Sequence, residues 1–208
     1  MKTELGISDL LLMYVGNLEA YQGIDLLLNS FALVLKRTQQ ADLVIIGGES
    51  ADIEKYVRKS RQLGIQAKVH FLGPKPVQHL RYYLSEADIL VSPRIKGNNT
   101  PMKLYSYLHS GKPVLATNLP AHTQLIDDRV AFLVESKEEP FSAAMLCLIA
   151  DEPLRAQLGR AGKQLIEEKF TYRAFREKLN GLFNSLETEM QLNQQSALPP
   201  VTSSKTPW

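Results

Sequence analysis

Short, predominantly apolar runs alternate with longer segments of helical periodicity along most of the chain. The runs lie at residues 11–15, 42–46, 68–72, 88–91, 114–117 and 131–134. Runs of this length are typical of strands buried on both faces, and helix-length segments between them are typical of crossover connections. The pattern therefore predicts an α/β fold with one doubly wound, mostly parallel sheet of about six strands and helices on both faces.

The pattern becomes wholly helical after residue 141. The last predicted helix, residues 172–186, has Thr171 as its cap and carries Phe175, Leu179, Leu182 and Phe183 as one apolar stripe. We expect this stripe to be an association surface for a second copy or for another domain. The predicted organisation is a linker-like segment at 1–10, one domain at 11–190, and a tail at 191–208 rich in Gln, Ser, Thr and Pro that is expected to be disordered.

Composition and charge exclude several classes of protein. The 208 residues are 44% hydrophobic and 22% charged, with a formal net charge of +2, which suits a globular domain and gives no long-range attraction to nucleic acid. Cys147, the only cysteine, is expected to be buried in a helix, and a lone cysteine fits a reducing compartment. The apolar run before Val15 is too short to cross a membrane, so a cytoplasmic location is expected, with peripheral attachment to the inner membrane left open.

The most informative stretch, residues 88–117, reads as strand, polar loop, helix and strand. Thr100 and Pro101 are expected to open the helix as cap and first-turn residue, and Ser110 with Gly111 to close it. The loop around Gly97 then lies at the carboxyl end of a strand and at the amino end of a helix. In an open α/β sheet this is where ligands bind, and the free N–H groups there attract phosphate.

The same stretch carries a family resemblance. Its order of motifs, D-I-L-V-S-P, then P-M-K, then G-K-P-V-L-A-T, resembles the carboxyl-terminal half of GT-B glycosyltransferases of the retaining family 4 (group 1), over residues 11–186. The resemblance implies a Rossmann-like domain that binds a nucleotide-diphosphate sugar without a metal. It also implies an amino-terminal acceptor domain, or a partner chain, beyond these residues.

The loop after the first strand contains Gly16, Asn17, Gln22 and Gly23, and glycines let the backbone approach a phosphate. The resemblance implies an Arg at position 17 and a Lys at position 22 that clamp the donor diphosphate. Asn and Gln stand there instead, and amides cannot neutralise a diphosphate. A turn that only joins strand to helix is the alternative interpretation.

A second departure concerns two carboxylates. The resemblance implies a Glu-x7-Glu motif, but Asn98 and Ser106 occupy its two positions, where the second Glu would hold the donor ribose. Lys103 matches the lysine of the P-x-K variant and is the remaining cation expected to act on the donor. We therefore assign Lys103 and Asn98 as candidate catalytic residues. A solvated helix lysine is the alternative for Lys103.

Other candidates complete the expected donor site. Arg94 could replace the lost diphosphate charge, Gly47 ends the second strand, and Leu72 resembles the base-binding edge of the family. Ser50 is expected to cap the helix that follows Gly47. The full set of expected donor-binding residues is Gly16, Asn17, Gln22, Gly23, Gly47, Leu72, Arg94, Gly97, Asn99, Thr100, Pro101 and Ser106.

The histidines do not suggest a metal. His70 is expected to be packed or at a sheet edge, His79 and His109 on helix surfaces, and His122 in the loop beyond the fifth strand. The leading hypothesis is a sugar transferase that needs a second domain, and the rival is a non-catalytic binding or scaffold module. A dehydrogenase is excluded because the first loop lacks G-x-G-x-x-G and no acidic residue closes the second strand.

Overall fold

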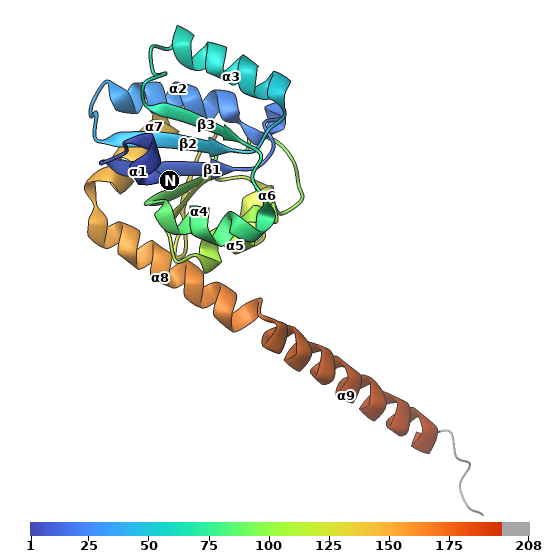
Figure 1. Cartoon of the computed structure of the whole chain (residues 1–208). Coiled ribbons are helices and arrows are strands. Elements are labelled where there is room, and N and C mark those ends of the chain that lie inside the picture. Colours follow the sequence, from blue (N-terminus) through green and yellow to red (C-terminus); the bar gives the residue numbers. More distant parts are fainter. Residues whose placement is uncertain (197–208) are drawn as a thin grey trace, which may run out of the picture. The chain divides into compact units, whose positions relative to one another are not determined.

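A six-stranded parallel sheet organises the chain in the computed structural model, which describes residues 1–196, with side chains described through residue 190 (Figure 1). The strands are β1 (Leu10–Val15), β2 (Ala41–Ile46), β3 (Val69–Gly73), β4 (Ile89–Ser92), β5 (Val114–Thr117) and β6 (Phe132–Val134). Their order is β3-β2-β1-β4-β5-β6, and every neighbouring pair is parallel. The predicted doubly wound fold is confirmed, and its topological switch point lies between β1 and β4.

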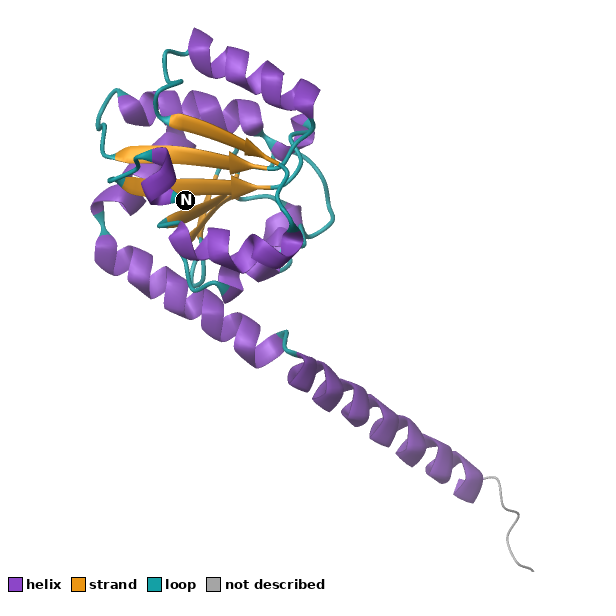
Figure 2. Ribbon diagram, in the orientation of Figure 1, coloured by secondary structure: helices purple, strands orange, loops and turns teal. Residues whose placement is uncertain are grey.

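Helices connect the strands on both faces of the sheet (Figure 2). The α-helices are α1 (Lys2–Leu5), α2 (Ile24–Leu35), α3 (Ser50–Gln62), α4 (Leu80–Glu86), α5 (Lys103–His109), α6 (Pro120–Thr123), α7 (Glu138–Ala150), α8 (Glu152–Lys169) and α9 (Tyr172–Ser196). Two short 3-10 turns, η1 (Ala20–Gln22) and η2 (Val77–His79), precede α2 and α4.

Alternate residues of each central strand enter opposite cores. In β1, Leu12 and Tyr14 belong to the core on the side of α2 and α7, whereas Leu11 and Met13 belong to the core on the side of α5. All four side chains are fully buried. This explains why the strands read as continuous apolar runs, since neither face of the sheet is open to water.

Two cap predictions are wrong. Glu49, not Ser50, precedes the first turn of α3, and no side chain caps that helix. Helix α5 begins at Lys103 behind Met102, so Thr100 is not its cap, because Pro101 and Met102 are still part of the loop. Thr171 does cap α9, accepting a hydrogen bond from the Ala174 N–H at 3.2 Å.

Cys147 is exposed, contrary to the prediction. Helix α7 turns Phe141, Ala144, Met145 and Leu148 toward the core, a spacing that places Cys147 on the opposite side of the helix.

The chain divides into two compact units, Met1–Glu167 and a second unit from Glu168 onward. The predicted linker residues form α1 within the first unit, where Lys2 bonds Asp88 at 2.6 Å. Helix α9 continues to Ser196, so 191–196 are helical although a disordered tail was predicted from 191, and 197–208 lie outside the described residues. The domain boundaries at 10 and 190 remain a prediction. Among the described helices, none is long and apolar enough to cross a membrane.

Candidate donor-binding site

The loops after β1, β2 and β4 interlock at the carboxyl ends of the strands. A Cβ atom at Gly23 would collide with the carbonyl of Pro93, and one at Gly47 with the carbonyl of Gly16. Gly16, Gly23 and Gly47 also have positive φ angles, of 152°, 76° and 109°. Glycine is therefore required here for conformation and for space, and it leaves the main chain open to a ligand at the switch point.

Lys103, the first residue of α5, reaches across the switch point to the loop after β1. Its ammonium group donates a hydrogen bond to Gln22 Oε1 at 3.1 Å and lies 4.0 Å from the centre of the Tyr14 ring. A Cβ atom at Gly16 would be 3.1 Å from Lys103 Nζ. Burial, with the positive charge of Arg94 nearby, lowers the pKa of Lys103 to about 7.

The two amides predicted to bind the donor differ in their surroundings. Gln22 is buried and holds Lys103, so it contributes to the site through that lysine. Asn17 is exposed, and its side chain donates to Glu19 at 2.9 Å. The Tyr14 hydroxyl donates to the Asn17 carbonyl at 2.6 Å, and burial raises the pKa of that hydroxyl above its usual range.

Arg94 folds back over the loop that follows β4. It donates to the carbonyls of Lys96 and Asn99 at 2.8 and 2.9 Å, and its guanidinium lies 5.0 Å from the centre of the Tyr21 ring. A Cβ atom at Gly97 would contact this guanidinium at 2.5 Å. Arg94 therefore shapes the loop and keeps its charge at the edge of the site.

Gln124, which no sequence signal identified, forms hydrogen bonds with the loop that follows β4. Its amide donates to the Asn98 carbonyl at 3.0 Å, and its oxygen accepts from the Thr100 hydroxyl at 3.2 Å. The side chains of Asn98 and Asn99 are exposed above these contacts, whereas Pro101 is buried.

His122 is buried, and it lies in the short helix α6 rather than in a loop as predicted. Its Nδ1 donates to the Thr117 carbonyl at 2.7 Å, which leaves Nε2 to accept from the Ser92 hydroxyl at 2.9 Å. Burial lowers the pKa of His122 to about 4, so the ring is neutral at pH 7. The His122 ring thus connects the ends of β4 and β5. The Thr117 hydroxyl in turn donates a hydrogen bond to the Arg94 carbonyl.

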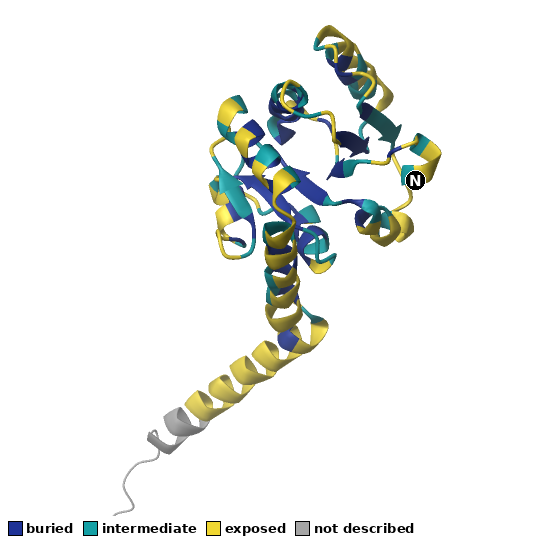
Figure 3. Cartoon of the chain, turned by 90° about the vertical axis from the view of Figure 1, so that its left-hand side faces the viewer, coloured by how far each residue is buried: buried dark blue, intermediate teal, exposed yellow. Residues whose placement is uncertain are grey.

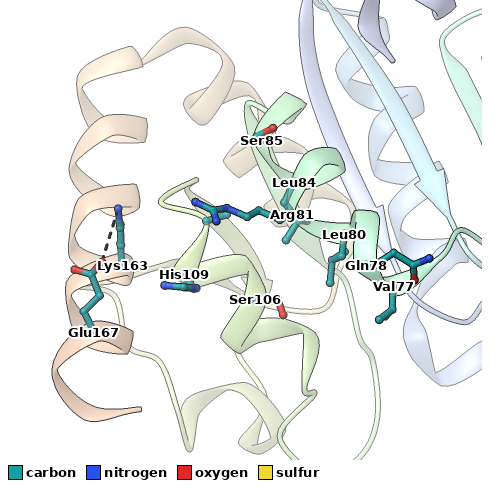
Figure 4. Close-up of a pocket in the computed structure, with 11 residues that line it drawn as sticks. Val77, Gln78, Leu80, Arg81, Leu84, Ser85, Ser106, His109, Lys163 and Glu167 are labelled. Carbon is teal, nitrogen blue, oxygen red and sulfur yellow. Dashed lines mark ion pairs between the residues drawn. The ribbon is translucent and has the colours of Figure 1, made fainter. Parts of the chain in front are cut away.

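Ser106 and Leu72 lie outside the group formed by Lys103, Gln22 and Tyr14, which we call the Lys103 cluster. Ser106 lines a separate hollow of about 650 Å³ between α4, α5 and α8 (Figure 4). The hollow also contains Arg81, His109 and Lys163. Leu72 is half-buried against the core on the α5 side.

The side chains of Lys103 and Arg94 carry positive charge that no neighbouring carboxylate among the described residues balances. Within residues 1–190, neither Lys103 nor Arg94 forms an ion pair with a carboxylate. The same residues contain no group of three or more His, Cys, Asp or Glu side chains arranged to hold a metal. The arrangement offers two cations, glycine-lined main chain and loop amides, which together suit an anionic, hydroxyl-rich ligand.

Known proteins share both the sequence and the fold. D-inositol 3-phosphate glycosyltransferase of Corynebacterium diphtheriae is 29% identical over 177 residues, which are 82% of this chain and 41% of that protein. The chain thus spans about two fifths of that relative's length.

Two solved structures are similar in fold. Anabaena Alr3699/HepE, solved in complex with UDP, matches with a TM-score of 0.77 at 16% identity, over 88% of this chain and 51% of that one. The carboxyl-terminal domain of the group 1 glycosyl transferase LpcC from Francisella tularensis matches with a TM-score of 0.72 at 21% identity, over 82% and 91%. The family described as "Glycosyl transferases group 1" matches residues 2–165. A match over most of the chain, on a fold whose switch point carries the Lys103 cluster, shows that this protein belongs to the group 1 glycosyl transferases.

Proposed function

We propose that the domain binds a nucleoside-diphosphate sugar, with the diphosphate over the loop from Gly97 to Lys103. The observation that carries the proposal is Lys103, a partly buried amine beside Gly16 with a neutral amide, Gln22, as its hydrogen-bond partner. The positive charge of this amine has no negative partner in the site, and an anionic ligand would supply one. The binding of UDP by the Anabaena structure of the same fold supports the nucleotide part of the proposal.

The chemistry proposed for this site is electrostatic. When the bond between sugar and diphosphate breaks, negative charge grows on the departing phosphate, and Lys103 with the loop N–H groups would stabilise it. The exposed amide of Asn98 would hydrogen-bond sugar hydroxyls next to that bond. Since these groups supply the charge, we propose that no metal is needed.

Transfer of the sugar to an acceptor would need a second domain. We propose transfer with retention, as in family 4, to an acceptor bound by an amino-terminal domain on this or another chain. The length of the relatives supports this, because the matched region is less than half of the corynebacterial protein. These residues alone would then bind the donor without completing transfer. A cytoplasmic location is part of the same proposal and is supported by the single cysteine.

Titration calorimetry with UDP, GDP, ADP and their hexose conjugates tests the proposal. We expect one nucleotide to bind, and Lys103→Met to weaken it by roughly tenfold to a hundredfold, the value of one charge-assisted hydrogen bond. The matched control is Lys36→Met, because Lys36 is an exposed lysine at the end of α2. If no nucleotide or conjugate binds the parent chain, the donor-site proposal is wrong. Binding that survives in Lys103→Met would place the ligand elsewhere.

A further inference from the structure

The pairing of β1 with β4 ends before β1 does. Its last pair is Met13 with Leu90, two residues before the end of β1. Along a parallel strand the N–H groups alternate between the two neighbouring strands, and Gly16 donates to the Ile46 carbonyl of β2 at 2.9 Å. The N–H of Val15 therefore points to the β4 side, beyond the last β4 partner. A main-chain donor at such a place needs an acceptor from elsewhere in the fold.

The hydroxyl of Tyr107 takes the place of the next β4 residue. It accepts a hydrogen bond from the Val15 N–H at 2.7 Å and donates to the Val15 carbonyl at 3.4 Å. At the other end of the same ladder, the Asp88 carboxylate accepts from the Leu11 N–H at 2.8 Å. A side chain thus extends the short ladder at each end, and Tyr107 extends the end at the candidate site.

Tyr107 is a fully buried residue of α5. Its side chain belongs to the same core as Met13 and Leu90. The central strands that this core covers are buried too and appear dark blue in Figure 3. Burial holds the pKa of the Tyr107 hydroxyl above its usual range, so the hydroxyl keeps its proton while a lysine titrates.

The same helix carries Lys103. Lys103 and Tyr107 are four residues apart on α5 and so share one face of it. Val15 directly precedes Gly16, and a Cβ atom at Gly16 would lie 3.1 Å from Lys103 Nζ. The bond from Tyr107 to Val15 therefore joins the two segments whose separation sets how closely the ammonium approaches the loop. The hydrogen bond from Lys103 to Gln22 is a second connection between α5 and that loop.

We propose that Tyr107 is a positioning residue, which holds α5 against the end of β1 and so fixes the Lys103 ammonium over Gly16. The inference rests on the proposed function, since Lys103 is the cation assigned there to the diphosphate. Without the hydroxyl, the Val15 N–H would lose its acceptor and α5 would move away from β1. The amine would then be less buried, and its pKa would rise towards that of an ordinary lysine.

NMR titration of isotope-labelled lysine side chains in the ligand-free protein tests the positioning. The Lys103 signal is the one that disappears in Lys103→Met. The titratable or charged groups near its amine are Tyr14, Arg94 and His122, and all three remain in the test variant. We expect Tyr107→Phe to raise the pKa of Lys103 from about 7 in the parent to about 8 or above.

Tyr56→Phe is the matched control. Tyr56 is equally buried, donates from its hydroxyl to Asp25 at 3.3 Å, and belongs to the core on the other face of the sheet. Both variants should have a lower melting temperature, because each loses a buried hydroxyl, but only Tyr107→Phe should change the Lys103 titration.

Amide hydrogen exchange provides a second measurement, which needs no variant. In the parent, the Val15 amide should exchange as slowly as the paired Met13 amide, although β4 does not reach it. In Tyr107→Phe the Val15 amide should exchange about tenfold faster, the value of one lost hydrogen bond.

Titration calorimetry with UDP connects the positioning to the proposed function. Tyr107→Phe should weaken UDP binding by about tenfold at pH 7 and shift the fall in affinity to higher pH, whereas Tyr56→Phe should do neither. If the parent binds no nucleotide, the proposed function is wrong, and the Lys103 titration still decides the role of Tyr107.

Three outcomes overturn the proposal. One is a pKa of Lys103 in Tyr107→Phe that equals the parent value, since the hydroxyl would then contribute to stability alone. Another is rapid exchange of the Val15 amide in the parent, because its bond to Tyr107 would be absent in solution. A third is a parent that binds UDP no more tightly than Tyr107→Phe does, because the position of Lys103 would then not affect the ligand.

Discussion

Lys103 and Gln22 are 81 residues apart in the sequence and are joined by one hydrogen bond of 3.1 Å from the ammonium group to the amide oxygen. The bond connects the loop after β1 to the first turn of α5. It holds a cation in place and leaves that cation without a negative partner. The electrostatic behaviour of the candidate site follows from this pair.

The affinity for UDP should fall as the pH rises above 7. Because the pKa of Lys103 is about 7 in the free protein, the amine loses its proton above that pH, and a bound diphosphate must restore it. Binding is then coupled to proton uptake, and the affinity should drop by up to about tenfold per pH unit between pH 7 and 9. Calorimetry in buffers of different ionisation enthalpy measures the uptake directly. Lys103→Arg should bind with little pH dependence, because a guanidinium stays charged; the same slope in that variant would refute the assignment.

Gln22→Lys should destabilise the free protein and tighten UDP binding. The new ammonium would lie beside that of Lys103, and two like charges at this distance repel each other until a diphosphate lies between them. We expect a lower melting temperature without ligand and a larger rise on adding UDP than in the parent. Gln22→Met, which removes the amide without adding charge, is the control. A lower melting temperature with unchanged UDP affinity would mean that the phosphate does not reach this loop.

Stability should decline between pH 6.5 and pH 4 in a manner that depends on His122. The pKa of this ring is about 4 in the folded protein against 6.5 for an ordinary histidine, so the unfolded chain binds the extra proton in that range. Unfolding is then favoured as the pH falls, by up to about 1.4 kcal/mol per pH unit. Urea unfolding of the parent and of His122→Gln at several pH values isolates this contribution. His79→Gln, which makes the same substitution at an exposed histidine, is the control.

Gly159→Ala should cost more stability than Gly162→Ala, although both residues lie in α8. A Cβ atom at Gly159 would collide with the carbonyl oxygen of Gly111, which is main chain and cannot turn aside. At Gly162 the nearest atom is Leu108 Cδ2 at 2.8 Å, the end of a flexible side chain. We expect a loss of about 1–3 kcal/mol for Gly159→Ala and clearly less for Gly162→Ala, measured by denaturant unfolding. Equal losses would show that α8 adjusts its position freely.

The pattern of apolar runs was sufficient to predict the strands, because the central strands are buried on both faces, and the half-buried edge strands β3 and β6 are still short and mostly apolar. Strand β5 was predicted at its observed bounds, and the others within one residue at each end. The helix starts were less predictable. Thr100 and Ser50 are residue types that commonly cap helices. Helix α5, however, begins three residues after Thr100, and Ser50 is itself the first residue of α3.

The position of Lys103 and of the loop glycines at the carboxyl ends of the strands was predictable, because each lies in a motif that the sequence itself displays. The contacts of a residue that acts through a neighbour were not predictable. The hydrogen bond that Gln22 accepts from Lys103 was not expected, and Gln124 contacts Asn98 and Thr100 from outside the recognised motif. Such partners are set by tertiary contacts between segments far apart in the sequence, which leave no local pattern.

The pairing of β1 with β4 has a consequence for folding. The two strands bring together the loops that hold Gln22 and Lys103, and their ladder is short, joining Leu12 to Ile89 and Met13 to Leu90. The candidate donor site therefore forms only after β1 has paired with β4. A partly folded chain that lacks this pairing has no complete site for the ligand. A ligand that binds here would report completion of folding, and at saturating concentration it would shift the population from such intermediates to the native state.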